Sequence, residues 1–155
     1  MAPLVDRLAS ARAIGDGRRI VATAIEAALG TRRTVSTLAA LRRRFPRVRF
    51  VWLMGADNLA QLPRWCHWRR IARGVPFAVL PRPSYNHRAL AGQAARALHR
   101  ARRRAETAPA LATAAAPAWL FLPTSQHAAS ATAIRAAATG VSDHRPQAAR
   151  PTLAA

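Results

Sequence analysis

Lysine is absent from this sequence and acidic residues are scarce. All 25 basic residues are Arg, and only six Asp and Glu oppose them, so the formal net charge is +19. Such a charge suits a polyanionic partner, namely nucleic acid, an anionic membrane surface or a phosphorylated substrate. The arginines accompany a large excess of Ala and 11 Pro, which a coding bias towards GC-rich codons explains equally well. The charge alone therefore identifies no partner.

Cysteine is limited to Cys66, which excludes an intramolecular disulfide and a zinc site built from cysteines. The five His show no close spacing typical of metal ligands, so we expect no metal cage. The sequence also contains no P-loop, no Gly-rich dinucleotide fingerprint and no spacing that indicates a Ser-His-Asp triad. These absences remove several common enzyme classes.

Long apolar runs are missing too, since none approaches the roughly 18 to 20 residues of a membrane helix. Asp6 and Arg7 occupy the positions where a signal peptide would have its apolar core. We therefore expect a soluble, cytoplasmic protein. Its 155 residues, 51% of them hydrophobic, are enough for one domain, predicted over residues 1–140, followed by a disordered tail over 141–155.

The most informative stretch is residues 48–68, VRFVWLMGADNLAQLPRWCHW. Residues 50–54 form an unbroken apolar run typical of a strand that is covered on both faces of a parallel sheet. Ligands bind beyond the carboxyl ends of such strands, so Asp57 is a candidate ribose contact, or else only a helix cap. Trp65 follows a rigid Leu-Pro-Arg turn, and its indole could stack on a heteroaromatic ring or pack in the core.

The remaining elements follow from apolar periodicity and from Gly and Pro breaks. Helices are predicted over residues 2–14, 34–45 (capped by Thr34), 58–73 (disturbed by Pro63), 87–106 and 130–138. Strands are predicted over residues 19–25, with Glu26 at the carboxyl end, and over 75–80 and 119–122; residues 107–117 are predicted to be a loop. Trp52 and Trp68 are expected to serve packing. The pattern predicts an α/β fold with a parallel sheet.

Two further groups could meet phosphate. Arg82 follows the predicted strand 75–80, where a guanidinium could bind phosphate or simply face water. Ser130 or Thr132 could begin the helix 130–138, whose N-terminal N–H groups suit an anion, and Arg135 would lie one turn inside it.

Four segments taken together resemble the bacterial nicotinate-nucleotide adenylyltransferases, which belong to the nucleotidyltransferase superfamily and have a Rossmann-like fold. Residues 51–68 are similar to the family's strand, G-x-D and L-P-x-W block. Residues 34–38 (TVSTL) are similar to its Y-T-x-D-T-L segment, 79–83 with Tyr85 to its strand and R-P-G-Y, and 130–135 (SATAIR) to its S-S-T-x-I-R motif.

The resemblance implies an enzyme that transfers AMP from ATP, with Mg²⁺, to nicotinate mononucleotide, giving deamido-NAD and pyrophosphate in NAD biosynthesis. It implies that Asp57 binds ribose and that Trp65 stacks on the nicotinate ring. The other implied substrate contacts are Thr34, Thr37 and Arg82. The contacts implied for the ATP phosphates are Ser130, Thr132 and Arg135.

The sequence departs from the family pattern at several positions. Arg33 replaces a Tyr, Cys66 stands where an aromatic is common, and the other changes are Ser36 for Asp, Ser84 for Gly and Ala131 for Ser. The opening segment G-G-x-F-[DN]-P-x-H-x-G-H is absent. We therefore expect a Rossmann-like sheet without the family's first strands, from an upstream start or a degraded copy, and an impaired enzyme whose catalytic residues are unknown.

Two other functions stay open. The chain could be a non-catalytic remnant that still binds the mononucleotide. It could instead be a basic nucleic-acid-binding protein in which Trp65 and Trp68 stack on bases.

Overall fold

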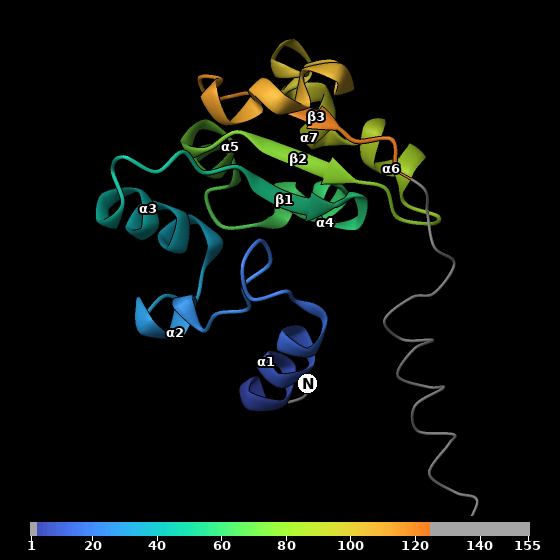
Figure 1. The fold of residues 1–155 in the computed structure, drawn as a ribbon. Coiled ribbons are helices and arrows are strands. Elements are labelled where there is room, and N and C mark those ends of the chain that lie inside the picture. The colour runs from blue at the N-terminus through green and yellow to red at the C-terminus, as the bar shows by residue number, and fades with distance from the viewer. Residues whose placement is uncertain (1–2, 125–155) are drawn as a thin grey trace, which may run out of the picture. The chain divides into compact units, whose positions relative to one another are not determined.

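A parallel three-stranded sheet lies at the centre of the computed structural model, which describes residues 3–124 (Figure 1). The strands are β1 (Trp52–Gly55), β2 (Phe77–Leu80) and β3 (Trp119–Phe121), in the order β1-β2-β3. The register aligns Trp52, Phe77 and Trp119 across the three strands, and the rings of Phe77 and Trp119 stack with centroids 5.8 Å apart. All three strands confirm predictions, as does the Rossmann-like α/β class.

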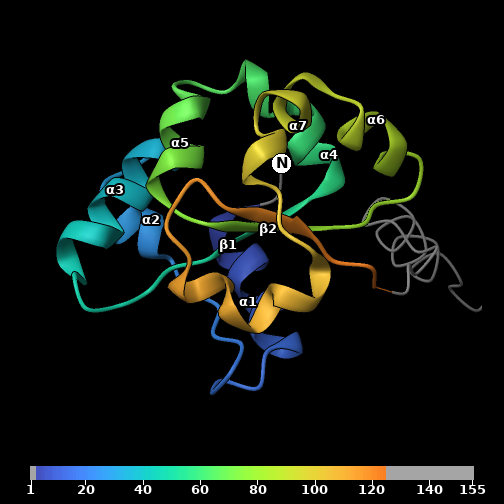
Figure 2. The same ribbon diagram turned by 90° about the horizontal axis from the view of Figure 1, so that it is seen from above.

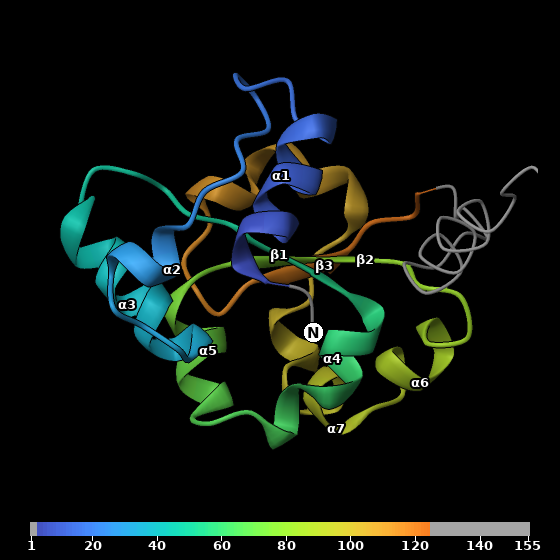
Figure 3. The same cartoon turned by 90° about the horizontal axis from the view of Figure 1, so that it is seen from below.

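Helices cover both faces of this sheet. One face carries α4 (Ala56–Gln61), α5 (Trp68–Gly74), α6 (Asn86–Leu90) and α7 (Gln93–Ala97), and the other carries the 3-10 helix η3 (Ala105–Thr113), as Figures 2 and 3 show. Alternate side chains of β2 pack on opposite faces of the sheet. Phe77 and Val79 belong to the larger cluster of core residues, and Ala78 belongs to the smaller one with Leu111. Near-continuous burial of β2 explains why its sequence is an apolar run.

The outer edge of β1 has no strand beside it among the described residues, since β1 pairs with β2 alone. Leu53, in the middle of β1, is 60% exposed. An apolar side chain exposed on an unpaired edge strand is unusual for a parallel sheet, whose strands are normally covered on both faces.

The chain ahead of the sheet forms α1 (Leu4–Ile14), α2 (Ile25–Ala28) and α3 (Thr34–Arg44). The strand predicted over residues 19–25 is wrong, because this segment is irregular and Glu26 lies in α2 instead of at the end of a strand. The carboxylate of Asp16 accepts hydrogen bonds from the N–H groups of Arg18, Arg19 and Ile20. Local bonds of this kind compete with strand pairing.

The cap predicted for α3 is also wrong. Arg33 occupies the N-cap position, no side chain caps this helix end, and Thr34 is the first helical residue. The helix ends at Arg44, one residue before the predicted end.

Breaks in the second half fall partly where the sequence predicts. The segment 58–73 is interrupted by the 3-10 turn η1 (Leu62–Arg64), which contains Pro63, as expected. The single helix predicted over 87–106 is wrong, because α6, α7 and the short η2 (His99–Ala101) replace it. Gly92 separates α6 from α7, and a Cβ there would lie 3.0 Å from the carbonyl oxygen of Arg88.

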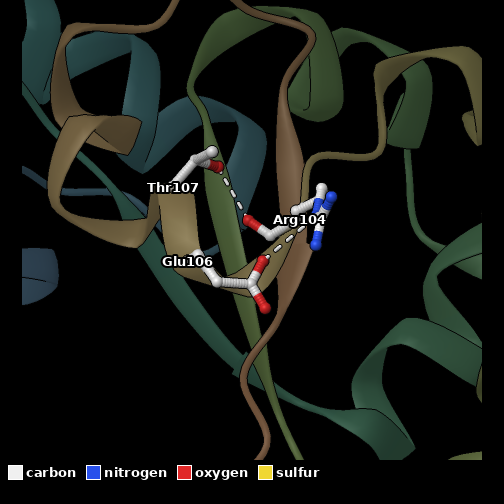
Figure 4. A network of polar contacts seen from close by, with 3 residues as sticks. All are labelled: Arg104, Glu106 and Thr107. Atoms are coloured by element: carbon white, nitrogen blue, oxygen red, sulfur yellow. Dashed lines mark hydrogen bonds and ion pairs between the residues drawn. The ribbon is translucent and has the colours of Figure 1, made fainter.

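The loop predicted over 107–117 is largely wrong as well, because η3 covers residues 105–113. A polar network opens this helix: Arg104 Nε donates to Glu106 Oε2 (3.3 Å), and the Thr107 hydroxyl donates to the Arg104 carbonyl (2.7 Å) (Figure 4). The helix predicted over 130–138 and the tail over 141–155 lie outside the described residues. None of the helices within residues 3–124 combines the length and apolar character that a membrane span requires.

Candidate functional site

Asp57 and Arg82 meet at the carboxyl edge of the sheet. The register pairs Gly55 of β1 with Leu80 of β2, so each charged residue follows its strand by two positions. Arg82 Nε lies 3.9 Å from Asp57 Oδ1, a distance that permits attraction but exceeds a direct hydrogen bond. The two predicted contacts therefore form one charged group at the edge where parallel sheets bind ligands.

Gly55 permits this close approach. A Cβ at this position would collide with Asp57 Oδ1 and would lie 3.0 Å from Arg82 Nε. The glycine is needed for space and not for an unusual backbone angle, since its φ is −79°.

The two oxygens of Asp57 have different surroundings. Oδ1 is buried and has no hydrogen-bond partner among the described residues, although the side chain as a whole is 36% exposed. Leaving a buried acceptor without a donor costs free energy. The Arg82 guanidinium, 3.9 Å away, offsets part of that cost, and the exposed part of the carboxylate stays open to a ligand hydroxyl.

Behind Arg82, the loop that leaves β2 is held by Asn86, the first residue of α6. The Asn86 Oδ1 accepts a hydrogen bond of 2.7 Å from the backbone N–H of Arg82. The sequence offered no signal for this contact beyond an Asn in a Pro-rich turn.

A second group surrounds a cavity of about 310 Å³, whose lining residues are Arg32, Arg33, Thr34, Trp65, Cys66 and Ile71. Thr34 opens α3 and Trp65 follows η1, so the cavity joins two predicted contacts that are distant in the sequence. The Trp65 ring packs against the Trp52 ring, with the two centroids 5.8 Å apart and an angle of 50° between the ring planes. Trp65 is half-buried, which fixes the ring while leaving part of it accessible.

Arg33 and Cys66 contact each other at this cavity. Arg33 Nη1 donates a hydrogen bond of 3.5 Å to Cys66 Sγ, across 33 residues of sequence. Arg32, Arg33 and Cys66 were not predicted as site residues; their only signal in the sequence is a position one or two residues from Thr34 or Trp65.

Thr37 lies apart from both groups. It is 6% exposed, and its hydroxyl lies 2.8 Å from the hydroxyl of Thr31 and 3.2 Å from the Arg33 carbonyl. Glu26 Oε1 is 3.4 Å away. These contacts tie α2 to α3, and the substrate role of Thr37 stays a prediction.

Trp52 and Trp68 serve packing, as expected. Trp68 is 7% exposed within the core, and Trp52 packs against that core. The predicted phosphate contacts Ser130, Thr132 and Arg135 lie outside the described residues, so their roles stay predictions.

Within residues 3–124, no three His, Cys, Asp or Glu side chains cluster closely enough to hold a metal ion. Mg²⁺ in phosphoryl-transfer sites is held mainly by substrate phosphates and water, with one or two carboxylates. At this edge of the sheet Asp57 supplies one carboxylate, which lies beside the Arg82 guanidinium.

No protein-family model matches the sequence, but curated relatives do. A probable nicotinate-nucleotide adenylyltransferase of Gluconacetobacter diazotrophicus is 62% identical over 138 residues, which is 89% of this chain and 64% of the relative. Proteins with the same name from Gluconobacter oxydans and Cereibacter sphaeroides are 57% and 55% identical over 135 residues, 87% of this chain. The chain spans 69% and 71% of those two relatives, and so about two thirds of each.

Proposed function

The chain belongs to the family of nicotinate-nucleotide adenylyltransferases, and on that basis we propose that it serves the transfer of AMP from ATP to nicotinate mononucleotide in NAD biosynthesis. One observation carries the proposal: Thr34 and Trp65, matched independently to two family motifs, line one cavity. The Asp57–Arg82 pair at the carboxyl edge of the sheet supports it. A cytoplasmic location suits a reaction that consumes ATP.

The reaction is a displacement at phosphorus. A phosphate oxygen of the mononucleotide attacks the α-phosphorus of ATP, a new P–O bond forms, and the bond to pyrophosphate breaks. Catalysis of such a step is mostly positioning and electrostatic stabilisation. Mg²⁺ bound to the ATP phosphates supplies positive charge.

The described residues would hold the acceptor. Trp65 offers a fixed aromatic face for the nicotinate ring, and Thr34 a hydroxyl beside it. Asp57 would accept a hydrogen bond from the ribose through the exposed part of its carboxylate, and the Arg82 guanidinium would bind phosphate. Ser130, Thr132 and Arg135 would hold the ATP phosphates.

The sequence supports mononucleotide binding better than it supports catalysis. Residues 1–155 contain neither the G-G-x-F nor the H-x-G-H of the family's opening segment. We therefore propose that residues 1–155 bind the mononucleotide but turn it over slowly.

Calorimetry with nicotinate mononucleotide tests the binding. We expect the purified chain to bind, and Trp65→Ala to weaken binding about tenfold or more, because stacking on a base contributes about 1–3 kcal/mol. Trp68→Phe, a change at a buried packing residue, is the control and should leave affinity within about twofold. Unchanged affinity in Trp65→Ala would contradict the assigned role.

Formation of deamido-NAD from Mg·ATP and the mononucleotide tests the chemistry. We expect a rate far below that of the Gluconacetobacter diazotrophicus relative measured beside it. An equal rate would overturn the proposed impairment, while binding without any turnover would identify a non-catalytic remnant.

Nucleic-acid binding is the second candidate, and one feature favours it. Two cavities of about 450 and 360 Å³ share Arg42 and are lined by several other arginines and no acidic residue. Affinity for single-stranded RNA that falls steeply with salt, without affinity for the mononucleotide, would replace the first proposal.

A further inference from the structure

Two departures from the family pattern meet in the structure. Arg33 stands in place of a Tyr and Cys66 in place of a common aromatic, and the guanidinium of one donates to the sulfur of the other at 3.5 Å. Both line the cavity that contains Trp65 and Thr34. Part of the lining of this cavity is therefore a guanidinium that is hydrogen-bonded to a thiol.

The cavity is positively charged. Arg32 lines it beside Arg33, and none of its six lining residues is acidic. Among the described residues, the two ion pairs involve Arg82 and Arg104, so no carboxylate there neutralises Arg32 or Arg33. A cavity lined by two arginines and an indole, without a carboxylate, suits a ligand that is both aromatic and anionic.

The N-terminus of α3 adds to this preference. Arg33 is the N-cap residue of a helix of 11 residues, and no side chain caps that end. Unpaired N–H groups and the positive end of the helix dipole favour negative charge close to Thr34.

We propose that Arg33 is a specificity-determining residue, whose guanidinium binds the carboxylate of the nicotinate ring and so favours the acid over the neutral amide. The inference rests on the proposed function. Cys66 acts as a positioning residue, because its sulfur accepts a hydrogen bond from Nη1 and so holds the guanidinium at the cavity that Trp65 also lines. The amide ring of nicotinamide mononucleotide presents no charge to Arg33, so it loses little when the charge is removed.

Arg33→Gln tests this with two ligands, nicotinate and nicotinamide mononucleotide, by calorimetry on the full chain. We expect affinity for the nicotinate form to fall about tenfold or more, because charge-assisted hydrogen bonds are roughly twice as strong as neutral ones. Affinity for the nicotinamide form should change less than about twofold. Arg43→Gln removes the same charge from the other end of α3, outside this cavity, and should leave the preference intact.

Equal losses for the two ligands in Arg33→Gln would overturn the inference while leaving the proposed function standing. Absence of binding by the unaltered chain would overturn both. Arg33 is exposed, so its replacement should not unfold the chain, and circular dichroism checks that.

A second pair of variants tests Cys66. Cys66→Ala removes the acceptor, and we expect affinity for the nicotinate form to fall about two- to threefold, while Cys66→Ser keeps an acceptor and restores it. Equal affinities in Cys66→Ala and the unaltered chain would remove Cys66 from the inference.

Discussion

The chain from Met54 to Leu120 and the chain ahead of it are packed very differently. Every buried hydrophobic residue of the described chain lies between those two positions. Residues 3–50 contribute one buried side chain, that of Thr37, and large apolar residues of α1 such as Val5 are exposed. Burial of apolar area is the main source of folding free energy. Most of the stability should therefore come from residues 54–120.

The candidate cavity draws on both parts, and this explains its composition. Trp65 and Ile71 come from the packed part, whereas Arg32, Arg33 and Thr34 come from the start of α3. The aromatic wall, formed by Trp65, is held in place by the core. The charged wall, formed by Arg32 and Arg33, depends on the polar contacts that Thr37 makes. Substitutions on the two walls should therefore differ in their effect on stability.

The largest effect should come from Phe77→Ala. Phe77 is fully buried between Trp52 and Trp119, and we expect the free energy of unfolding to fall by about 3–5 kcal/mol in urea denaturation. Val5→Ala, on the exposed surface of α1, should change it by less than about 0.5 kcal/mol. If Phe77→Ala does not fold, Phe77→Leu should still lose more than Val5→Ala. Equal losses in both parts would contradict the comparison.

Thr37→Val should have the next largest effect. It keeps the shape of the side chain and removes the hydroxyl contacts with Thr31, Glu26 and the Arg33 carbonyl. We expect a loss of roughly 1 kcal/mol and faster hydrogen exchange at the N-terminus of α3. Thr113→Val, which removes an exposed hydroxyl contact in η3, is the control. No change in exchange at α3 would show that this network does not hold the charged wall.

The same division explains how much the sequence predicted. β2 was predictable because burial on both faces leaves an apolar run that ends at Pro81. β1 is also an apolar run, which ends at Gly55, although its Leu53 is exposed. The run at residues 19–25 carries the same signal, yet no strand lies beside it among the described residues, and Asp16 bonds the backbone locally instead. An apolar run shows that a segment could be buried in a sheet, but it does not show whether a neighbouring strand is there to pair with it.

The site was predictable in part for a related reason. Asp57 and Arg82 each follow a predicted strand, and parallel strands end at one edge, so their meeting follows from the fold class. The contact of Arg33 with Cys66 does not follow from any local pattern, because it depends on where the start of α3 lies relative to η1. Residues separated by 33 positions meet only through tertiary packing.

Asp57→Asn, at the edge of the sheet, should weaken binding of nicotinate mononucleotide without changing the stability of the chain. Its ion pair with Arg82 is long and partly exposed, so we expect the free energy of unfolding to change by less than about 0.5 kcal/mol. Affinity for nicotinate mononucleotide should fall about tenfold, because an amide is a poorer acceptor for a ribose hydroxyl than a carboxylate. Glu106→Gln alters the other ion pair of the described residues and should leave affinity unchanged. A loss of stability without a loss of affinity would make Asp57 a structural residue.

The smallest effect concerns the turn at Asp16, in the weakly packed part. The N–H of Ile20, followed by those of Arg18 and Arg19, holds the pKa of the Asp16 carboxyl below its ordinary value of 3.8. Because the pKa is lowered by folding, the contribution of the turn is present above about pH 4 and is lost as pH falls through the folded pKa. In NMR titration, the Ile20 amide shift should therefore move with a midpoint below 3.8, while the Phe77 amide, bonded to the Ala118 carbonyl, stays constant through that transition. Asp16→Asn should abolish the Ile20 transition, and a midpoint at or above 3.8 would show that the turn does not bind the carboxylate.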